Sequence, residues 1–299
     1  MSIGLSLHIG LNNVDPESYD GWNATLAAAE KDAEDMSAIA KSQGFETTLL
    51  KAPVATRDAV IGAVRKAAER LAAGDIFLLS YAGHGGQVLD VSGDEKDDSS
   101  KDDAGGSLQD RLLDEYDETW LLFDGHFLDD ELRALWPAFK PGVRIFVVSD
   151  SCHSGSVTRT IADGKRTAKD LTREEKLAIY GTETPRFRYM PADAAVRAYK
   201  KDYKFYDKLQ NDLPNPPEPI AATVRLFSGC KDDQESGDGD ENGLFTGRLK
   251  KVWNGGKFEG DYASFHRAIL EGMPDDQTPV HSVIGVPNPA FDAQRPFEI

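Results

Sequence analysis

The fold is decided by one stretch of the sequence, Val143-Arg-Ile-Phe-Val-Val-Ser-Asp-Ser-Cys-His-Ser-Gly-Ser156. Its apolar run is typical of a buried strand and ends abruptly in small and polar residues, and Cys152 lies just past that end. In an open α/β sheet, binding sites form at the carboxyl ends of the strands. A lone cysteine at such a place is often only a small buried apolar residue. Its chemistry therefore depends on what lies beside it.

A second apolar run, from Asp75 to Tyr81, leads into a turn with one histidine among three glycines, Ala82-Gly-His-Gly-Gly-Gln87. Glycines let the backbone turn tightly and approach a substrate. His84 and Cys152 thus each follow a predicted buried strand. If these strands are neighbours in one parallel sheet, their carboxyl ends are adjacent. The residues between them are then expected to form a loop and a crossover helix.

Strands and helices alternate along the rest of the chain, which predicts an α/β fold with a mostly parallel sheet covered by helices on both faces. Thr56 is expected to cap one of these helices. The expected strands are 4–11, 45–50, 75–81, 143–148, 222–228 and, with weak alternation, 280–286. The expected helices are 23–42, 56–73, 127–139, 244–252 and 262–271, and residues 90–118 are expected to form a long exposed acidic loop.

Composition narrows the class of partner. The 299 residues include 34 basic and 51 acidic side chains, a net charge of −17 that argues against nucleic acid or an anionic membrane as the main partner. The apolar runs are strand-sized, which predicts no transmembrane helix, and the first residues show no signal peptide. Two cysteines do not make a disulfide framework, so a reducing cytoplasm is the simplest compartment.

The segment from Arg159 to Lys208 has the opposite charge balance. It carries 13 Lys and Arg against 8 Asp and Glu. Short helices are expected at 173–179 and 192–209, and 214–219 is expected to be a linker. An insert of this length is usually exposed, mobile or functional. It is interpreted as a solvated linker, a lid or a processing region.

The predicted Cys152–His84 pair fits nucleophilic catalysis, because an imidazole can take the thiol proton or stabilise the thiolate. The Gly85 and Cys152 backbone N–H groups are candidate donors to the developing oxyanion. Zinc is the competing use of such residues, but the sequence has no Cys-x-x-Cys and no paired histidine spacing.

Two motifs resemble the histidine and cysteine boxes of metacaspases, the caspase-like cysteine peptidases. They are Ser80-Tyr-Ala-Gly-His-Gly85 and Asp150-Ser-Cys-His-Ser-Gly155. Other similar blocks are Lys31-Asp-Ala-Glu-Asp-Met36, Ser228-Gly-Cys-Lys-Asp-Asp-Gln234, Gly243-Leu-Phe-Thr246 and Gln294-Arg-Pro-Phe297. The similarity covers nearly the whole chain except residues 159–219 and is closest to bacterial-type metacaspases, or orthocaspases.

The resemblance implies a caspase-hemoglobinase fold with a six-stranded sheet, built as one domain. Its parts would be a p20-like region at 1–158, a linker at 159–219 and a p10-like region at 220–299. Cys152 would be the nucleophile and His84 the general acid and base. Protein or peptide substrates would be cut after Arg or Lys, held by the S1 carboxylates Asp32 and Asp150. Asp32 also fits a solvated helix position, and Asp150 also fits a loop-bracing role.

Calcium activation and a monomeric state are further properties that the resemblance implies. Asp117, Asp129 and Asp130 match three carboxylates of the family's calcium site, while the fourth position falls near Arg159 and is not acidic. Calcium prefers six to eight oxygen ligands. Asp129 and Asp130 equally fit the start of a helix, where acidic residues complement the dipole.

An Arg/Lys-specific peptidase that carries its own basic insert suggests self-cleavage between Arg159 and Lys208. Two other readings stay open for the whole chain. One is a catalytically silent binding or regulatory module with the same fold. The other is a thiol amidase or acyl-transferase that uses the same dyad.

Overall fold

The computed structural model of the chain describes residues 2–91, 116–152, 172–180, 186–214, 220–231 and 234–299. Its centre is a six-stranded sheet in the order β11-β9-β7-β3-β1-β2, in which only β11 runs antiparallel. The strands are β1 (Gly4–Gly10), β2 (Glu46–Lys51), β3 (Ile76–Ala82), β7 (Arg144–Asp150), β9 (Thr223–Ser228) and β11 (Val280–Gly285). The predicted α/β class and the mostly parallel sheet are confirmed.

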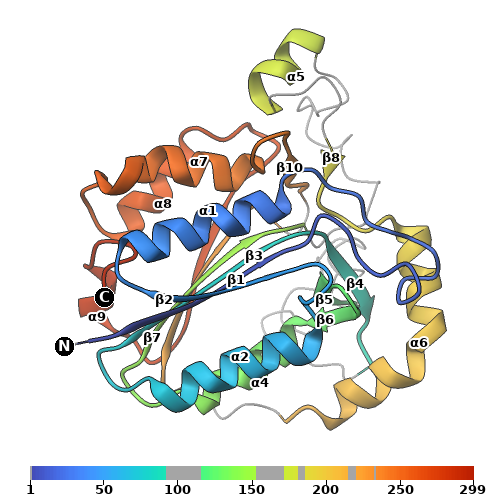
Figure 1. Cartoon of the computed structure of the whole chain (residues 1–299), viewed down its shortest axis with the longest axis horizontal. Coiled ribbons are helices and arrows are strands. Elements are labelled where there is room, and N and C mark those ends of the chain that lie inside the picture. Colours follow the sequence, from blue (N-terminus) through green and yellow to red (C-terminus); the bar gives the residue numbers. More distant parts are fainter. Residues whose placement is uncertain (1, 92–115, 153–171, 181–185, 215–219, 232–233) are drawn as a thin grey trace, which may run out of the picture.

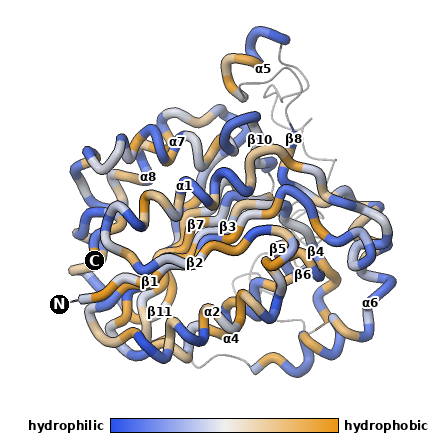
Figure 2. The backbone as a smooth tube through the Cα atoms, viewed as in Figure 1, coloured by the Kyte–Doolittle hydropathy of each residue, from blue (hydrophilic) through white to orange (hydrophobic). Residues whose placement is uncertain are grey.

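Helices cover both faces of this sheet (Figure 1). One face carries α1 (Ala29–Ser42), α7 (Leu244–Trp253) and α8 (Tyr262–Leu270), and the other carries α2 (Arg57–Arg70) and α4 (Asp129–Leu135). Alternate residues of β3 and β7 feed the two cores: Leu78 and Phe146 pack on one side, and Leu79 and Ile145 on the other. Figure 2 shows the resulting apolar strands between helices of mixed polarity.

A second, three-stranded antiparallel sheet follows the histidine turn and lies beside the carboxyl ends of the central strands (Figure 1). It consists of β4 (Gly85–Leu89), β5 (Tyr116–Leu122) and β6 (Gly125–Leu128). Two predictions are therefore wrong, because residues 85–87 of the expected turn and 116–118 of the expected loop belong to strands, and the helix expected at 127–139 is present but begins at Asp129. Buried Val88, Leu121 and Leu128 explain the difference, because these strands need a covered face.

Helix α1 begins at Ala29, six residues later than the predicted start at 23. Ala24 has a left-handed backbone with φ of 52°, which no helix can include. The Asn12 Oδ1 atom accepts from the Glu30 N–H at 3.1 Å and acts as a cap from a distant residue. Helix α2 ends at Arg70, three residues early, and its predicted cap is confirmed because Thr56 Oγ1 accepts from the Ala59 N–H.

The insert forms α5 (Arg173–Tyr180), β8 (Arg186–Phe187) and α6 (Ala192–Asp212), so both expected helices are present. Strand β8 pairs antiparallel with β10 (Gly237–Asp238). The expectation of an exposed insert is wrong for its middle, since Arg188 is fully buried and Met190 is 1% exposed. Shorter elements are η2 (Trp136–Ala138), η4 (Asn254–Gly256) and α9 (Pro289–Asp292).

Some expectations fall outside the described residues. These are the acidic stretch at 92–115, the basic residues at 159–171, and most of the linker at 214–219. Among the helices that the structure describes, none combines the length and the apolar character needed to cross a membrane.

Candidate active site

The histidine and cysteine boxes meet because β3 and β7 are neighbours in register, with Ala82 opposite Asp150. His84 and Cys152 each lie two residues beyond this last matched pair. The Gly83 N–H donates to the Asp150 carbonyl at 3.4 Å and ties the two turns together. Both candidate side chains are buried, with His84 6% and Cys152 0% exposed. The two turns thus lie at the ends of neighbouring strands, and a catalytic pairing of the imidazole with the thiol stays a prediction.

The guanidinium of Arg188 fills a buried pocket of three carboxylates. Its Nη2 atom lies 2.5 Å from Asp32 Oδ2 and 2.9 Å from Asp238 Oδ1, and its Nη1 atom lies 3.1 Å from Asp150 Oδ2. All four side chains are at most 1% exposed. Asp32 is therefore a pocket residue and not a solvated helix position. The two carboxylates expected to bind a cation do contact one here.

Burial and the neighbouring charges shift the pKa values in this pocket. Burial raises the pKa of Asp32 to about 6, and the charge of Arg188 opposes the rise. Burial lowers the pKa of Arg188, but the charges of Asp150, Asp32 and Asp238 outweigh that effect and raise it. Arg188 is a fixed cation, whereas Asp32 takes up a proton in mildly acidic solution.

Neighbouring groups hold the carboxylates in place. Asp150 accepts hydrogen bonds from Ser236 Oγ at 2.7 Å and from Thr246 Oγ1 at 2.6 Å. Asp32 accepts from Asn242 Nδ2 at 2.7 Å. A Cβ atom at Gly243 would lie 2.6 Å from the guanidinium carbon of Arg188, so only glycine leaves room for this side chain.

The backbone of Arg188 is held as firmly as its side chain. Its carbonyl oxygen accepts from the Gly85 N–H at 2.9 Å and from the Cys152 N–H at 3.1 Å. These are the two N–H groups that the sequence nominates as oxyanion donors. The Arg188 N–H donates to the Ser236 carbonyl at 3.0 Å, which continues the antiparallel pairing of β8 with β10.

The residues after Arg188 pass the histidine. His84 Nδ1 lies 3.0 Å from the Tyr189 carbonyl oxygen, and the Met190 N–H donates to the Gly85 carbonyl at 2.9 Å. The Trp22 ring packs edge-on against His84 with centroids 4.9 Å apart. Burial lowers the pKa of His84 to about 3, so this imidazole is neutral at pH 7. Its Nε2 atom has no hydrogen-bond partner within the described part of the chain.

Both cysteines are free thiols, as expected. The Cys152 sulfur accepts a hydrogen bond from the Ser236 N–H. Cys230 lies on the neighbouring strand end, where its sulfur is 3.5 Å from the Ser151 carbonyl oxygen. A hydrogen bond with Cys152, together with burial, raises the pKa of the Cys230 thiol. Cys230 is therefore a neutral neighbour of the candidate nucleophile.

Sequence reasoning missed Asp238, Ser236 and the role of Arg188. Asp238 follows the fifth parallel strand within an acidic loop, so the strand-end rule that nominated Cys152 could have nominated it as well. Arg188 carries no local signal, because it is one of 13 basic residues in a charged insert. Only its position against residues far along the chain distinguishes it.

The three candidate calcium ligands lie apart from this pocket. Asp117 is buried in β5, and Asp129 and Asp130 begin α4. Among the residues that the structure describes, no group of three or more His, Cys, Asp or Glu side chains is placed to hold a metal ion. The fourth position near Arg159 lies outside these residues. Calcium binding therefore stays a prediction.

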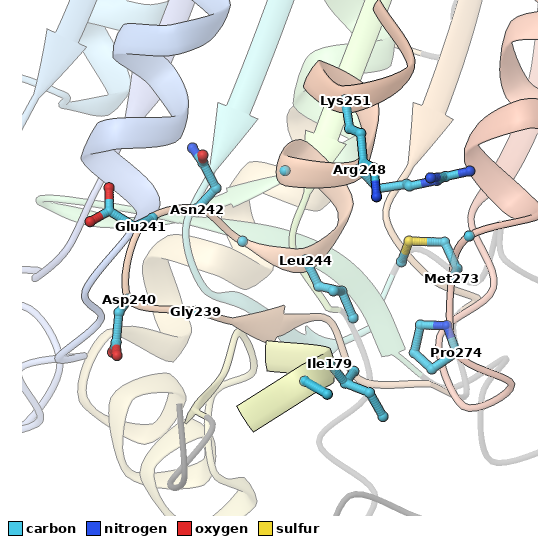
Figure 3. Close-up of a pocket in the computed structure, with 14 residues that line it drawn as sticks. Ile179, Gly239, Asp240, Glu241, Asn242, Leu244, Arg248, Lys251, Met273 and Pro274 are labelled. Atoms are coloured by element: carbon cyan, nitrogen blue, oxygen red, sulfur yellow. The ribbon is translucent and has the colours of Figure 1, made fainter. Parts of the chain in front are cut away.

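Figure 3 shows a separate cavity of about 620 Å³. Ile179 of α5 faces it from the insert, and Leu244, Arg248 and Met273 line its other walls. Asn242 and Gly243 line this cavity and also donate hydrogen bonds to Asp32, so these two residues lie between the two spaces. The cavity contains neither Cys152 nor His84.

Comparison with known proteins gives consistent results. A family model described as the caspase domain, Peptidase_C14, matches residues 9–292. Metacaspase-1A of Aspergillus niger is 30% identical over 187 residues, 58% of this chain and 42% of that protein. Metacaspase-1A of Neurospora crassa is 26% identical over 272 residues, 82% of this chain and 53% of that protein. The matched region thus spans about half, or less, of these two relatives.

A solved structure, protein GSU0716 of Geobacter sulfurreducens, is similar over nearly its whole length. The two chains share 45% sequence identity with a TM-score of 0.80, over 99% of this chain and 98% of that one.

Proposed function

Because the chain belongs to the caspase-domain family of cysteine peptidases, we propose that it is an endopeptidase that cuts after Arg or Lys. Cys152 is the nucleophile and His84 the general acid and base. One observation carries the proposal: Arg188 of the same chain lies in the site as a substrate residue would. Its side chain meets three carboxylates, and its carbonyl oxygen meets two N–H donors.

Each contact of Arg188 corresponds to a requirement of the reaction. Two N–H donors at the carbonyl oxygen stabilise the charge that develops when a nucleophile attacks its carbon. Antiparallel pairing along β10 fixes the peptide direction. The carboxylates select a cation, and three of them leave the pocket negative even when one cation is bound. An uncharged or acidic side chain would leave buried charges unpaired, which is costly.

The chemistry follows from these positions. The Cys152 thiol loses its proton to His84, and the sulfur attacks the carbonyl carbon of the P1 residue. The C–N bond breaks as His84 returns the proton to the leaving nitrogen, and a thioester remains. Water, deprotonated by His84, then hydrolyses the thioester to a carboxylate and restores the thiol. His84 is neutral at pH 7, as a proton acceptor must be, but the burial that lowers its pKa to about 3 also makes it a weak base in the uncut chain.

The same observation supports self-cleavage at one bond. The sequence suggests a cut between Arg159 and Lys208, and we propose Arg188–Tyr189 as that bond. In the uncut chain Arg188 is fully buried in the pocket, so it excludes the side chain of any external substrate. The uncut chain is therefore a self-blocked form of the enzyme.

Intact-mass analysis of the wild type and of Cys152→Ala tests this proposal. We expect the wild type to separate into fragments that end at Arg188 and begin at Tyr189, and Cys152→Ala to stay whole. Equal cleavage of both chains at this bond would mean that another protease cuts it. A wild type that remains whole while turning over Arg peptides would contradict self-blocking.

Arg188→Ala allows turnover of external peptides to be measured without self-cleavage at Arg188. This variant lacks the side chain that fills the pocket, so we expect it to turn over short fluorogenic peptides with Arg or Lys at P1. Assays of a peptide library varied at P1, with and without calcium ions, measure both the P1 specificity and the dependence of turnover on calcium. No turnover by this folded variant would favour a silent module, and turnover of small amides alone would favour an amidase.

A further inference from the structure

Met190 is buried two residues beyond the bond at Arg188. It is 1% exposed and belongs to one apolar cluster with Ala194 and Ala198 of α6 and with four residues from outside the insert, Val14, Tyr19, Ala24 and Leu121. The four partners are themselves at most 3% exposed. None of them comes from the insert: three lie in the segment between β1 and α1, and Leu121 lies in β5. The body of the enzyme thus provides an apolar site for a side chain of the insert.

The backbone fixes this site relative to the catalytic residues. Tyr189 forms a parallel bridge with Gly85, and the Met190 N–H donates to the Gly85 carbonyl at 2.9 Å. The Leu121 N–H donates to the His84 carbonyl at 3.0 Å, which joins the wall of the site to the catalytic turn. A peptide held by Gly85 on both sides of the cut therefore presents its second residue after the cut to this cluster.

We infer that this cluster is a primed-side subsite that selects a large apolar side chain at the second residue after the cut. The inference rests on the proposed function and adds a specificity that the acidic pocket does not supply. A charged side chain at this position would be buried among apolar groups without a partner, which is costly. A large aliphatic side chain instead removes apolar surface from water.

The subsite distinguishes among the basic residues of the insert. Of the 13 Lys and Arg between 159 and 208, three have Ile, Leu or Met two positions later: Arg159, Lys169 and Arg188. Arg186 and Arg173 are followed at that position by Arg188 and Glu175. The pocket for P1 alone cannot make this distinction. The subsite therefore helps to decide which bond of the insert is cut.

The test compares self-cleavage of Met190→Asp, Met190→Leu and the matched control Val196→Asp. Val196 lies on α6 and is 52% exposed, so the control adds the same charge outside the cluster. We expect Met190→Leu and Val196→Asp to cut after Arg188 within about twofold of the wild-type rate. We expect Met190→Asp to be cut there at no more than about one tenth of the wild-type rate. If Met190→Asp is cut at the wild-type rate, the subsite is contradicted, and Met190 serves only to anchor α6.

A second set of variants distinguishes failure of the subsite from failure of the proposed function and from misfolding. Arg188→Ala and Arg188→Ala/Met190→Asp should turn over the same short Arg peptide equally, because that peptide ends at the leaving group. If neither does, the proposed function fails. Arg188→Ala/Met190→Gly vacates the subsite and is given two longer peptides that differ only in Met or Asp two residues after Arg. A tenfold higher kcat/KM for the Met peptide is expected, and equal values would overturn the subsite.

Discussion

At the scale of single residues, the pocket around Arg188 is defined by an imbalance of charge. One guanidinium faces three carboxylates, all buried. Breaking a buried pair by removing one partner typically costs roughly 3 to 5 kcal/mol, because the remaining charge is left without compensation. A cost of this order applies when Arg188 is removed from the pocket. An empty pocket must therefore admit water, take up protons or bind another cation. This requirement is the physical origin of the expected preference for Arg and Lys.

Asp238→Asn tests the carboxylate that sequence reasoning missed. Asp238 accepts from Arg188 Nη2 and Nε, and neutralising it removes one charge-assisted contact with the P1 side chain. In the Arg188→Ala background, we expect kcat/KM for an Arg peptide to fall by about tenfold to a hundredfold. Steady-state kinetics measures the change.

Asp240→Asn is the matched control for this variant. It is the same substitution two residues further along, on an exposed side chain. It should leave kcat/KM unchanged. Equal effects of the two variants would show that the change reflects the overall charge of the loop, and no effect of Asp238→Asn would remove Asp238 from the pocket.

The sequence predicts those site residues whose signal is local. Cys152, His84 and Asp150 each follow an apolar strand, and Asp32 lies in a recognisable block on the first helix. Asp238 and Arg188 are different, because each lies in a charged segment where exposure is the ordinary expectation. Their burial depends on partners that only the folded chain supplies. A local pattern cannot distinguish Arg188 from the other basic residues of its insert.

At the scale of elements, the segment between β1 and α1 positions one side of the active site. Asn12 holds this segment: its Oδ1 atom accepts from the Glu30 N–H, and its Nδ2 atom donates to the Ala27 carbonyl at 3.2 Å. Asp238 accepts from the Ala27 N–H at 2.7 Å, so the segment also contacts the acidic pocket. The same segment contributes Trp22, which packs on His84.

Asn12→Ala should therefore affect both stability and catalysis. Loss of a helix cap costs about 1 kcal/mol, and we expect a decrease of this size in the free energy of unfolding, measured in urea on the Cys152→Ala chain. In the Arg188→Ala background we expect several-fold lower peptide turnover, because the wall beside His84 is loosened.

Asn12→Asp provides the comparison within this element. It keeps an acceptor for the Glu30 N–H at the positive end of the helix and loses only the donor to Ala27. Its loss of stability should be smaller than that of Asn12→Ala. Equal losses would assign the effect to the Ala27 contact and not to the cap.

The central strands and their helices could be predicted from the sequence because the spacing of apolar residues and the length of each segment indicate the same element over many residues. The three-stranded sheet could not, because β4 and β6 have only five and four residues and β4 follows directly from the glycine-rich turn. Gly85 and Gly86 suggest a loop, yet both lie in β4. A Cβ atom at Gly86 would lie 3.0 Å from a Leu121 methyl group, so this glycine permits close packing of two strands. Its role is visible only with the partner strand in place.

At the scale of the whole molecule, one buried segment joins elements that are far apart in the sequence. Arg188 contacts one carboxylate from α1, one from the end of β7 and one from β10. Cutting the chain after Arg188 breaks no strand of the central sheet, since β8 lies outside it. We therefore expect the cut chain to keep its fold, and the change on cleavage to be local to the site.

The pH dependence of stability should reflect the buried histidines. Burial lowers the pKa values of His8, His84 and His126 to about 3, whereas the unfolded values are near 6.5. The unfolded chain therefore binds more protons below pH 6.5, and stability is lost as the pH falls. Burial raises the pKa of Asp32 to about 6, so the folded chain binds one proton more between about pH 6 and 4, which opposes the loss.

For these four groups, the difference between about pH 6 and pH 4 is three imidazole protons on the unfolded chain against one carboxyl proton on the folded chain. At 1.36 kcal/mol per proton and pH unit, they lower the free energy of unfolding by about 3 kcal/mol per pH unit in this window. Burial also lowers the pKa of His281 to about 4, which adds to the loss. Urea unfolding of the Cys152→Ala chain at pH 7.5, 6 and 5 measures it. His8→Gln removes one of the three imidazoles and should reduce the slope by about 1.4 kcal/mol per pH unit. If the free energy of unfolding of the Cys152→Ala chain did not change with pH, these histidines would exchange protons with water in the folded chain. The closed site around His84 would then have to be open.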